Sequence, residues 1–366
     1  MVSEDCFAGK KLVIAVTYQI DPKAIEEIKA IAPSLTIEFK PIKSWYPEGF
    51  PTDRDFFIDA DFLLTLRYLP ATLDLAPKLQ YAQLSQSGVD SVVNTEYVTK
   101  TDYPLCNASG VHGPQICEYV FMEILNHNHH AHYLMENQRK GFFELTVTEG
   151  GVEDLTDARI GVIGYGSIGR QIGRVAKAHG MKVIAYTSSP RTTPESRVEN
   201  NMYVPSNTGD PQGLLPDEWH HGKTKEDFDN FLALAKLDYL VMALPLTPIT
   251  NGMLGKKQFE IMTSGVNQGK KPMLVNIGRG PIVKTMELID ALNNDVIGAA
   301  ALDVTDPEPL PSDHPLWKTK NCTISPHRSG KSNKYVERVL EILIQNLKNM
   351  KDGKPLINTV SRHKGY

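Results

Sequence analysis

The sequence predicts a two-domain α/β protein in which each domain is built on a parallel β-sheet. Short apolar segments typical of buried strands alternate with segments typical of helices along nearly the whole chain. The length of 366 residues corresponds to two domains of ordinary size. In the middle of the chain, a glycine-rich turn directly follows one strand-like segment and opens a helix. Parallel sheets with helices on their faces account for all three observations.

The first strand is expected at residues 11–16, because KLVIAV is short, apolar and rich in β-branched residues. Asp21 and Pro22 come next and open a helical pattern, since proline is favoured in the first turn of a helix. Further strands are predicted at residues 35–39 and 61–66 and in the segment LQYAQLSQSG, which ends at Gly88. Strands that alternate with helices in this way predict parallel pairing.

The second part of the chain begins with a long helix, predicted from about Gln115 to Lys140. A strand at residues 159–163 runs directly into the glycine-rich turn. Residues 194–224 are rich in Pro, Asn and Gly and show no periodicity, so they are predicted to be a loop insertion that contains His220 and His221. The remaining strands are expected at residues 182–186, 237–244, 273–277, 297–304 and from Thr323.

The final element is an amphipathic helix from about Ser332 to Met350, which Gly353 ends. One face of this helix carries only apolar residues, namely Val336, Val339, Leu340, Leu343 and Leu347. A helix with such a face buries it against the rest of its domain.

Composition and charge exclude several classes of protein. Lys and Arg number 39 and Asp and Glu number 43, and a net charge of −4 argues against nucleic-acid binding. No stretch reaches the ~18 consecutive apolar residues that a membrane helix needs, and the N-terminal residues show no secretory signal. The four cysteines, Cys6, Cys106, Cys117 and Cys322, form no CxxC pair, which fits a reducing compartment and predicts a cytoplasmic protein.

Gly164, Gly166 and Gly169 form a GxGxxG motif between a strand and a helix, which is the context that dinucleotide binding requires. The first glycine makes a tight turn, and the second lets the backbone approach a pyrophosphate. The third lets the helix pack on the strand, so that its N-terminus, with Ser167 and Ile168, faces the phosphates. The alternative is a glycine-rich turn that binds no ligand, which we consider less favoured because the motif lies in the full context of a dinucleotide site.

The end of the next strand predicts which dinucleotide is bound. An NAD site usually has Asp or Glu there, but here the strand runs into Thr187, Ser188, Ser189 and Arg191 with no acidic residue. Hydroxyl groups and an arginine accept a 2′-phosphate, which a carboxylate repels. We therefore expect NADP(H) to be preferred over NAD(H). The alternative is that Arg191 points into solvent and both cofactors are accepted.

Three polar side chains of different chemistry, Arg279, Glu308 and His327, follow the ends of three predicted strands. Ligands of open α/β sheets bind beyond the carboxyl ends of strands, where these groups can converge. An arginine grips a carboxylate with two hydrogen bonds, a histidine transfers a proton near neutral pH, and a glutamate orients the histidine. Together they suit reduction of a 2-oxo acid by a nicotinamide cofactor. Taken one at a time, Arg279 could be an ordinary surface arginine, Glu308 a loop carboxylate and His327 a histidine at a strand end.

With these motifs in order, nearly the whole chain resembles the D-isomer-specific 2-hydroxyacid dehydrogenase family. The resemblance includes the turn at Ser87 and Gly88 within QSGVD, the segment LPLTPIT at 244–250, and the motifs NIGRG, DVTDPEPLP and SPHRSG. It implies that Arg279, Glu308 and His327 are the catalytic set. It also implies a substrate role for Ser87 and Gly88, and cofactor roles for Leu244, Pro245, Thr250, Ile277, Asp303, Ser329 and Gly330, with Asp303 near the nicotinamide.

The resemblance also implies the domain organisation. Residues 1–112 and 332–366 would form a discontinuous substrate-binding domain, and residues 113–331 a Rossmann domain. Both would be Rossmann-like or flavodoxin-like parallel-sheet domains with the active site in a cleft between them. The helix after Gln115 would contribute to a homodimer interface. Tyr68 and Leu69, just past a strand, are candidates for substrate selectivity, with plain domain packing as the equal alternative.

Two departures from the family pattern indicate the branch. Thr187 replaces the usual Asp, as in glyoxylate and hydroxypyruvate reductases, and Glu308 stands where formate dehydrogenases carry Gln. Glyoxylate or hydroxypyruvate is therefore the first candidate substrate. Two alternatives stay open: a dehydrogenase for bulkier branched or aromatic 2-oxo acids, and a cofactor-sensing regulatory protein similar to the dehydrogenase-like transcriptional co-repressors.

A histidine cluster, HNHHAH at residues 127–132, lies in the long predicted helix. Histidines three residues apart share a face of a helix, which permits metal binding in principle. No cysteine or acidic residue adjoins them at ligand spacing, so a polar helix face or a dimer contact is the preferred interpretation. We expect no metal site.

Overall fold

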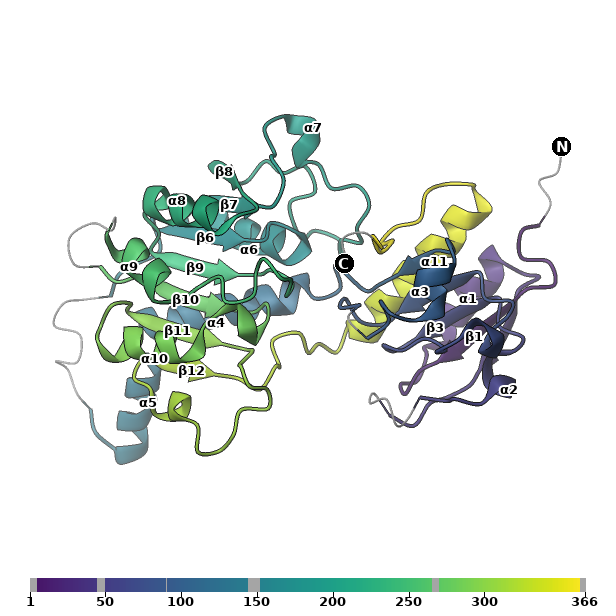
Figure 1. Ribbon diagram of the computed structural model, residues 1–366, viewed down its shortest axis with the longest axis horizontal. Helices are drawn as coiled ribbons and strands as arrows, with labels where there is room; N and C mark the ends of the chain where they lie inside the picture. The colour runs from purple at the N-terminus through teal and green to yellow at the C-terminus, as the bar shows by residue number, and fades with distance from the viewer. Residues whose placement is uncertain (1–4, 45–49, 90, 144–151, 265–269, 363–366) are drawn as a thin grey trace. The chain divides into compact units, whose positions relative to one another are not determined.

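The computed structural model describes residues 5–44, 50–89, 91–143, 152–264 and 270–362. The chain divides into two compact units. The first comprises residues 1–111, 200–205 and 332–366, and the second comprises residues 112–199 and 206–331. Residues 200–205 pack with the first unit, although the sequence pattern does not set them apart from the second. Figure 1 shows the elements of each unit.

The first unit is a five-stranded parallel sheet in the order β2-β1-β3-β4-β5. Helix α1 starts with Pro22, and the Asp21 carboxylate caps it by accepting a 2.9 Å hydrogen bond from the Lys23 N–H. The apolar face of α11 packs into the same core as the strands. The elements are β1 (Lys11–Ala15), α1 (Pro22–Ile31), β2 (Thr36–Phe39), α2 (Arg54–Phe57), β3 (Phe62–Thr65), η2 (Leu73–Leu75), β4 (Tyr81–Leu84), α3 (Glu96–Lys100), β5 (Leu105–Cys106) and α11 (Tyr335–Lys351).

The second unit is a seven-stranded parallel sheet in the order β12-β11-β10-β9-β6-β7-β8. Its elements are α4 (Gly113–Asn128), α5 (Ala131–Lys140), β6 (Arg159–Ile163), α6 (Ser167–Ala178), β7 (Lys182–Thr187), α7 (Pro194–Arg197), β8 (Glu218–His221), α8 (Lys225–Ala235), β9 (Tyr239–Met242), α9 (Lys256–Ser264), β10 (Met273–Asn276), η3 (Gly280–Ile282), α10 (Thr285–Asn293), β11 (Ala299–Leu302), η4 (Pro315–Lys318) and β12 (Cys322–Ile324).

Successive residues of each central strand in the second unit enter two different cores. In β9, Leu240 packs with helices α8, α9 and α10, whereas Val241 packs with helices α4 and α6. The sheet is therefore buried on both faces, which explains why its strands are continuous apolar runs in the sequence. This sheet has the Rossmann strand order and the first unit has the flavodoxin-like order, so the predicted fold class is confirmed.

Two predicted elements differ in the structure. The helix expected over residues 115–140 is two helices, because α4 ends at Asn128 and His130 adopts a left-handed conformation with φ of 51° before α5 begins. His220 and His221, predicted to lie in a loop, belong to the edge strand β8, which pairs with β7. In the part of the chain that the structure describes, no helix is long and apolar enough to span a membrane.

Candidate active site

The glycine-rich turn after β6 has the backbone geometry of a dinucleotide site. Gly164 has φ of 100°, and a Cβ atom there would lie 2.6 Å from the carbonyl oxygen of Ala243. A Cβ atom at Gly169 would lie 2.2 Å from the carbonyl oxygen of Gly164, so helix α6 packs directly on the turn. Gly166 is the N-cap of α6, and nothing lies within 4 Å of its missing side chain. The first N–H groups of α6, at Ser167 and Ile168, follow this open position, which fits a pyrophosphate.

The loop after β7 holds the residues predicted to select the cofactor. The Thr187 hydroxyl donates a 2.7 Å hydrogen bond to the carbonyl oxygen of Ser189, and Ser188 and Ser189 are exposed. The Arg191 side chain is half-buried, and its Nη1 group donates to the carbonyl oxygen of Ser196 in α7. One nitrogen of the Arg191 guanidinium therefore stabilises the loop after β7 by binding its far end at Ser196.

His327 and Glu308 are brought into direct contact. Nδ1 of His327 lies 2.8 Å from Oε1 of Glu308, and both side chains are exposed. A carboxylate at Nδ1 fixes the tautomer of the ring and leaves Nε2 for a substrate. His327 itself has φ of 51°, and its N–H donates a 2.9 Å hydrogen bond to the carbonyl oxygen of Asp303.

Asp303, only 2% exposed, organises the loop that carries His327. Its carboxylate accepts hydrogen bonds from the N–H of Arg328 at 2.7 Å and from the N–H of Ser329 at 3.0 Å, and from the hydroxyl groups of Ser325 and Ser329. A buried carboxylate with this many donors holds a loop in one conformation. The structure thus gives Asp303 a positioning role that sequence reasoning missed, because the partners are backbone groups of another strand end.

Arg279 projects from a turn that Asn276 shapes. The buried Asn276 amide accepts a 3.1 Å hydrogen bond from the N–H of Gly278 and donates one of 3.1 Å to the carbonyl oxygen of Arg279. Nη1 of Arg279 donates to the carbonyl oxygen of Gly278 at 2.8 Å, and the side chain is half-buried. A Cβ atom at Gly280 would lie 1.9 Å from the carbonyl oxygen of Thr305, so this turn lies against the segment that follows β11.

Other residues with predicted cofactor roles lie beside these turns. A Cβ atom at Gly278 would lie 2.6 Å from the carbonyl oxygen of Leu244. The Thr250 hydroxyl donates a 2.8 Å hydrogen bond to the carbonyl oxygen of Pro245 and so closes the segment between them. Ile277 is buried in the core that α4 and α6 cover. The carbonyl oxygen of Gly330 accepts a 3.0 Å hydrogen bond from the side chain of Gln115.

The predicted substrate residues outside this unit belong to the first unit, after β3 and β4. The Ser87 hydroxyl donates a 3.0 Å hydrogen bond to the carbonyl oxygen of Ala108, and Gly88 follows it half-buried. Asp90 of the same motif lies outside the described residues. The ring of Tyr68 lies under the guanidinium of Arg67, 5.3 Å from its centroid. Leu69 is buried in the core of the first unit, which the packing alternative explains.

The family model described as "D-isomer specific 2-hydroxyacid dehydrogenase, NAD binding domain" matches residues 121–208 and 203–329. These segments make up more than half of the chain and contain the glycine-rich turn, Arg279, Glu308 and His327. The chain belongs to the D-isomer-specific 2-hydroxyacid dehydrogenase family. The predicted resemblance is confirmed, and with it the prediction of an NAD(P)-dependent dehydrogenase.

Several relatives of this dehydrogenase extend over most of its length. A glyoxylate reductase of Aeropyrum pernix is 28% identical over 367 aligned positions, which cover 96% of this chain and 97% of the relative. A hydroxypyruvate reductase of Blautia hydrogenotrophica is 27% identical, covering 83% of this chain and 86% of the relative. The crystal structure of a D-isomer specific 2-hydroxyacid dehydrogenase from Xanthobacter autotrophicus Py2, in complex with NADPH and MES, has the same fold. Its TM-score is 0.72 at 23% identity, covering 98% of this chain and all of that one.

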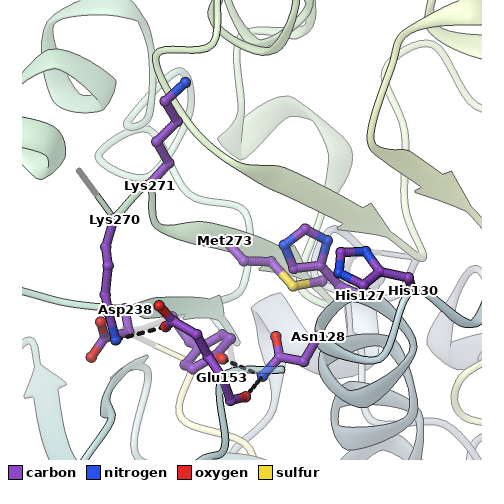
Figure 2. A pocket seen from close by; sticks show the side chains of 9 residues that line it. His127, Asn128, His130, Glu153, Asp238, Lys270, Lys271 and Met273 are labelled. Atoms are coloured by element: carbon purple, nitrogen blue, oxygen red, sulfur yellow. Dashed lines mark hydrogen bonds and ion pairs between the residues drawn. The ribbon is translucent and has the colours of Figure 1, made fainter. Parts of the chain in front are cut away.

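A separate pocket of about 210 Å³ lies at the amino ends of strands β9 and β10 of this dehydrogenase. Lys270 pairs with Glu153 at 2.6 Å, and the Asn128 amide donates to the Tyr239 hydroxyl at 2.7 Å. Figure 2 shows Lys270, Glu153 and Asn128 at this pocket. Its lining is His127, Asn128, His130, Glu153, Asp238, Tyr239, Lys270, Lys271 and Met273, which includes none of the predicted site residues. Burial lowers the pKa of His127, and the neighbouring His130 lowers it further. Among the residues that the structure describes, no three His, Cys, Asp or Glu side chains are grouped so that they could hold a metal ion.

Proposed function

We propose that this dehydrogenase reduces a 2-oxo acid to the D-2-hydroxy acid, with NADPH as the preferred hydride donor. The contact between His327 and Glu308 is the observation that carries the proposal. The pair provides a histidine whose Nδ1 is occupied by a carboxylate and whose Nε2 is available to give a proton to a carbonyl oxygen. The Glu308 carboxylate at Nδ1 holds the imidazole ring in one orientation for this step.

In the proposed mechanism, the residues of this chain bind, orient and protonate the substrate. Arg279 binds the carboxylate of the 2-oxo acid. The family resemblance assigns a substrate role also to Ser87 and Gly88. His327 donates a proton to the carbonyl oxygen, and Glu308 orients the imidazole ring through its contact with Nδ1. The bound NADPH supplies the hydride. Tyr68 contributes to selection of the substrate side chain, whereas Leu69 packs in the core of the first unit.

The preference for NADPH is supported by the loop after β7. Thr187, Ser188 and Ser189 provide hydroxyl groups where a carboxylate would repel the 2′-phosphate, and Arg191 adds a positive charge. The Xanthobacter enzyme, with the same fold, was crystallised with NADPH. Glyoxylate and hydroxypyruvate are the first candidate substrates, because relatives that extend over most of the chain are named as reductases of these acids.

The test is oxidation of NADPH, and separately of NADH, against glyoxylate, hydroxypyruvate, and branched and aromatic 2-oxo acids. We expect turnover with NADPH, with a kcat/KM about tenfold or more above that for NADH, as one charge-assisted phosphate contact predicts. The ranking of the acids then gives the size of the pocket. Tight cofactor binding without turnover on any acid would contradict the proposal and favour a cofactor-sensing regulatory protein.

We also propose a homodimer that forms through α5, in the cytoplasm. The support is a run of exposed apolar side chains, Tyr133, Leu134 and Met135 on α5 and Phe142 and Phe143 directly after it. The free state of all four cysteines supports a reducing compartment.

The dimer is tested by a charge on this surface. Light scattering of the unmodified protein should give twice the mass of one chain, and Leu134→Lys should shift it toward a monomer, because the 44% exposed side chain would place a charge in the interface. Leu234→Lys on α8 is the matched control, since Leu234 is 70% exposed and Figure 1 shows α8 well apart from α5 within the second unit. Equal masses for both variants and the unmodified protein would argue against this interface.

A further inference from the structure

We infer that the insertion between β7 and β8 positions the loop at residues 188–197 for the 2′-phosphate of NADPH, with Asp210 as the positioning residue. The inference rests on the proposed preference for NADPH. It gives a role to a segment that is longer than the connection between two neighbouring strands requires.

The insertion returns to the glycine-rich turn after passing through the first unit at residues 200–205. Asp210, only 6% exposed, accepts a 3.2 Å hydrogen bond from the hydroxyl of Tyr165, which is the second residue of the GxGxxG motif. Its carboxylate also accepts the N–H groups of Leu214 at 3.0 Å and Leu215 at 3.1 Å. The pKa of Tyr165 is raised mainly by burial and further by the charge of Asp210, so the phenol keeps its proton and remains a hydrogen-bond donor. The carboxylate thereby folds the insertion and attaches it to the cofactor turn.

Arg170 connects this attachment to the loop after β7. Its side chain lies on α6 and is only 2% exposed. One arm of the guanidinium donates to the carbonyl oxygen of Asp210, and the other donates at 2.6 Å to the carbonyl oxygen of Arg197. The guanidinium also lies 5.6 Å from the centroid of the Tyr165 ring. One buried cation therefore joins the helix behind the pyrophosphate site, the insertion and the end of the loop.

Arg197 carries the connection on to Arg191. Nε of Arg197 donates a 2.9 Å hydrogen bond to the carbonyl oxygen of Arg191, and its guanidinium lies 5.7 Å from the centroid of the Trp219 ring. Gly213 of the insertion packs against it, because a Cβ atom there would lie 2.6 Å from Cβ of Arg197. The backbone of Arg191 is thus fixed from the insertion side, independently of its own side chain.

A loop held in its binding conformation loses less entropy when the phosphate binds. Loss of the Asp210 carboxylate should free the insertion and, through Arg170 and Arg197, the loop. The effect should fall on the affinity for the 2′-phosphate and leave the hydride step unchanged. This separates a positioning role from a general role in folding.

The experiment compares the unmodified protein with Asp210→Ala by calorimetric titration with 2′,5′-ADP and with 5′-AMP, which lacks only the 2′-phosphate. We expect Asp210→Ala to weaken binding of 2′,5′-ADP by about tenfold and binding of 5′-AMP by less than about threefold. The KM for NADPH should rise in parallel while kcat stays within about twofold. Asp210→Asn keeps one carbonyl oxygen for the Leu214 N–H and should restore part of the affinity.

The matched control is Asp217→Ala, which removes another carboxylate that accepts a backbone N–H, that of Val183, but faces Lys177. It should lower the melting temperature without changing the ratio of the two affinities. Arg191→Ala gives the reference for loss of the predicted phosphate ligand. If Asp210→Ala does not fold, Arg197→Met, which keeps an apolar contact with Trp219 but lacks the bond to Arg191, takes its place.

The outcomes separate the inference from the proposed function. If the unmodified protein binds 2′,5′-ADP and 5′-AMP equally, both the preference for NADPH and the inference fail. If it prefers 2′,5′-ADP and the Asp210 and Arg197 variants keep the same ratio, the inference alone is overturned.

Discussion

Replacement of His327 by alanine is expected to lower kcat by about 10²–10⁴-fold while the affinity for NADPH is retained. The reason is that the variant loses the group that gives a proton to the carbonyl oxygen. The affinity for NADPH is retained because the cofactor turn lies between β6 and α6, which do not include His327. The Asp303 carboxylate would also still hold the loop at residue 327 through the N–H groups of residues 328 and 329. Turnover and NADPH titration of the same preparation measure both quantities.

Two further variants test whether the loss of turnover is specific to the contact between His327 and Glu308. Glu308→Gln keeps a hydrogen-bonding group at Nδ1 but removes the charge, so a smaller loss than in His327→Ala is expected. His221→Ala removes an exposed histidine from the edge strand β8 and should leave turnover unchanged. Turnover of His327→Ala at the level of the unmodified enzyme would exclude His327 as the proton donor.

Replacement of Arg279 by alanine should reduce kcat/KM for the 2-oxo acid by about 10²–10³-fold, which corresponds to loss of a charge-assisted, two-pronged contact with the carboxylate. Arg279→Lys keeps the charge but cannot form both hydrogen bonds in one plane, so it should recover only part of this loss. Steady-state kinetics with the best acid from the panel measures the effect.

The control for Arg279 is an arginine close to His327 in the sequence. Arg328 has an exposed side chain, and only its backbone N–H contacts Asp303, so Arg328→Ala tests loss of positive charge near the histidine. It should change kcat/KM by less than about threefold, as expected for an exposed charge. Equal losses in both variants would mean that Arg279 acts through general charge and not by gripping the carboxylate.

The sequence predicts the two parallel sheets because their central strands are buried on both faces and therefore apolar throughout. It also predicts that Glu308 and His327 can meet, although they lie 19 residues apart. Each follows one of two neighbouring parallel strands, β11 and β12, whose carboxyl ends lie at the same edge of the sheet.

What the sequence does not reveal depends on polar contacts between distant segments. Strand β8 is not predicted because EWHH is short and polar, as an edge strand can be. The segment is a strand because it pairs with β7. The break before α5 arises from a left-handed histidine rather than from Gly or Pro. The positioning roles of Asp303 and Asp210 depend on hydrogen bonds to backbone groups, which leave no pattern of residue types.

The contribution of α11 to the first core has a consequence for the order of folding during synthesis. That core joins residues between Phe7 and Val111 to Val339, Leu343, Leu347 and Val360. All of the second unit, residues 112–199 and 206–331, is translated before α11. The first unit therefore completes its core only after the second unit has been synthesised, although N-terminal domains generally fold first. The apolar strands of the first unit are made first, but they pack against α11 only at the end of synthesis. Nascent chains that stall before residue 335 should therefore expose the hydrophobic surface that chaperones bind.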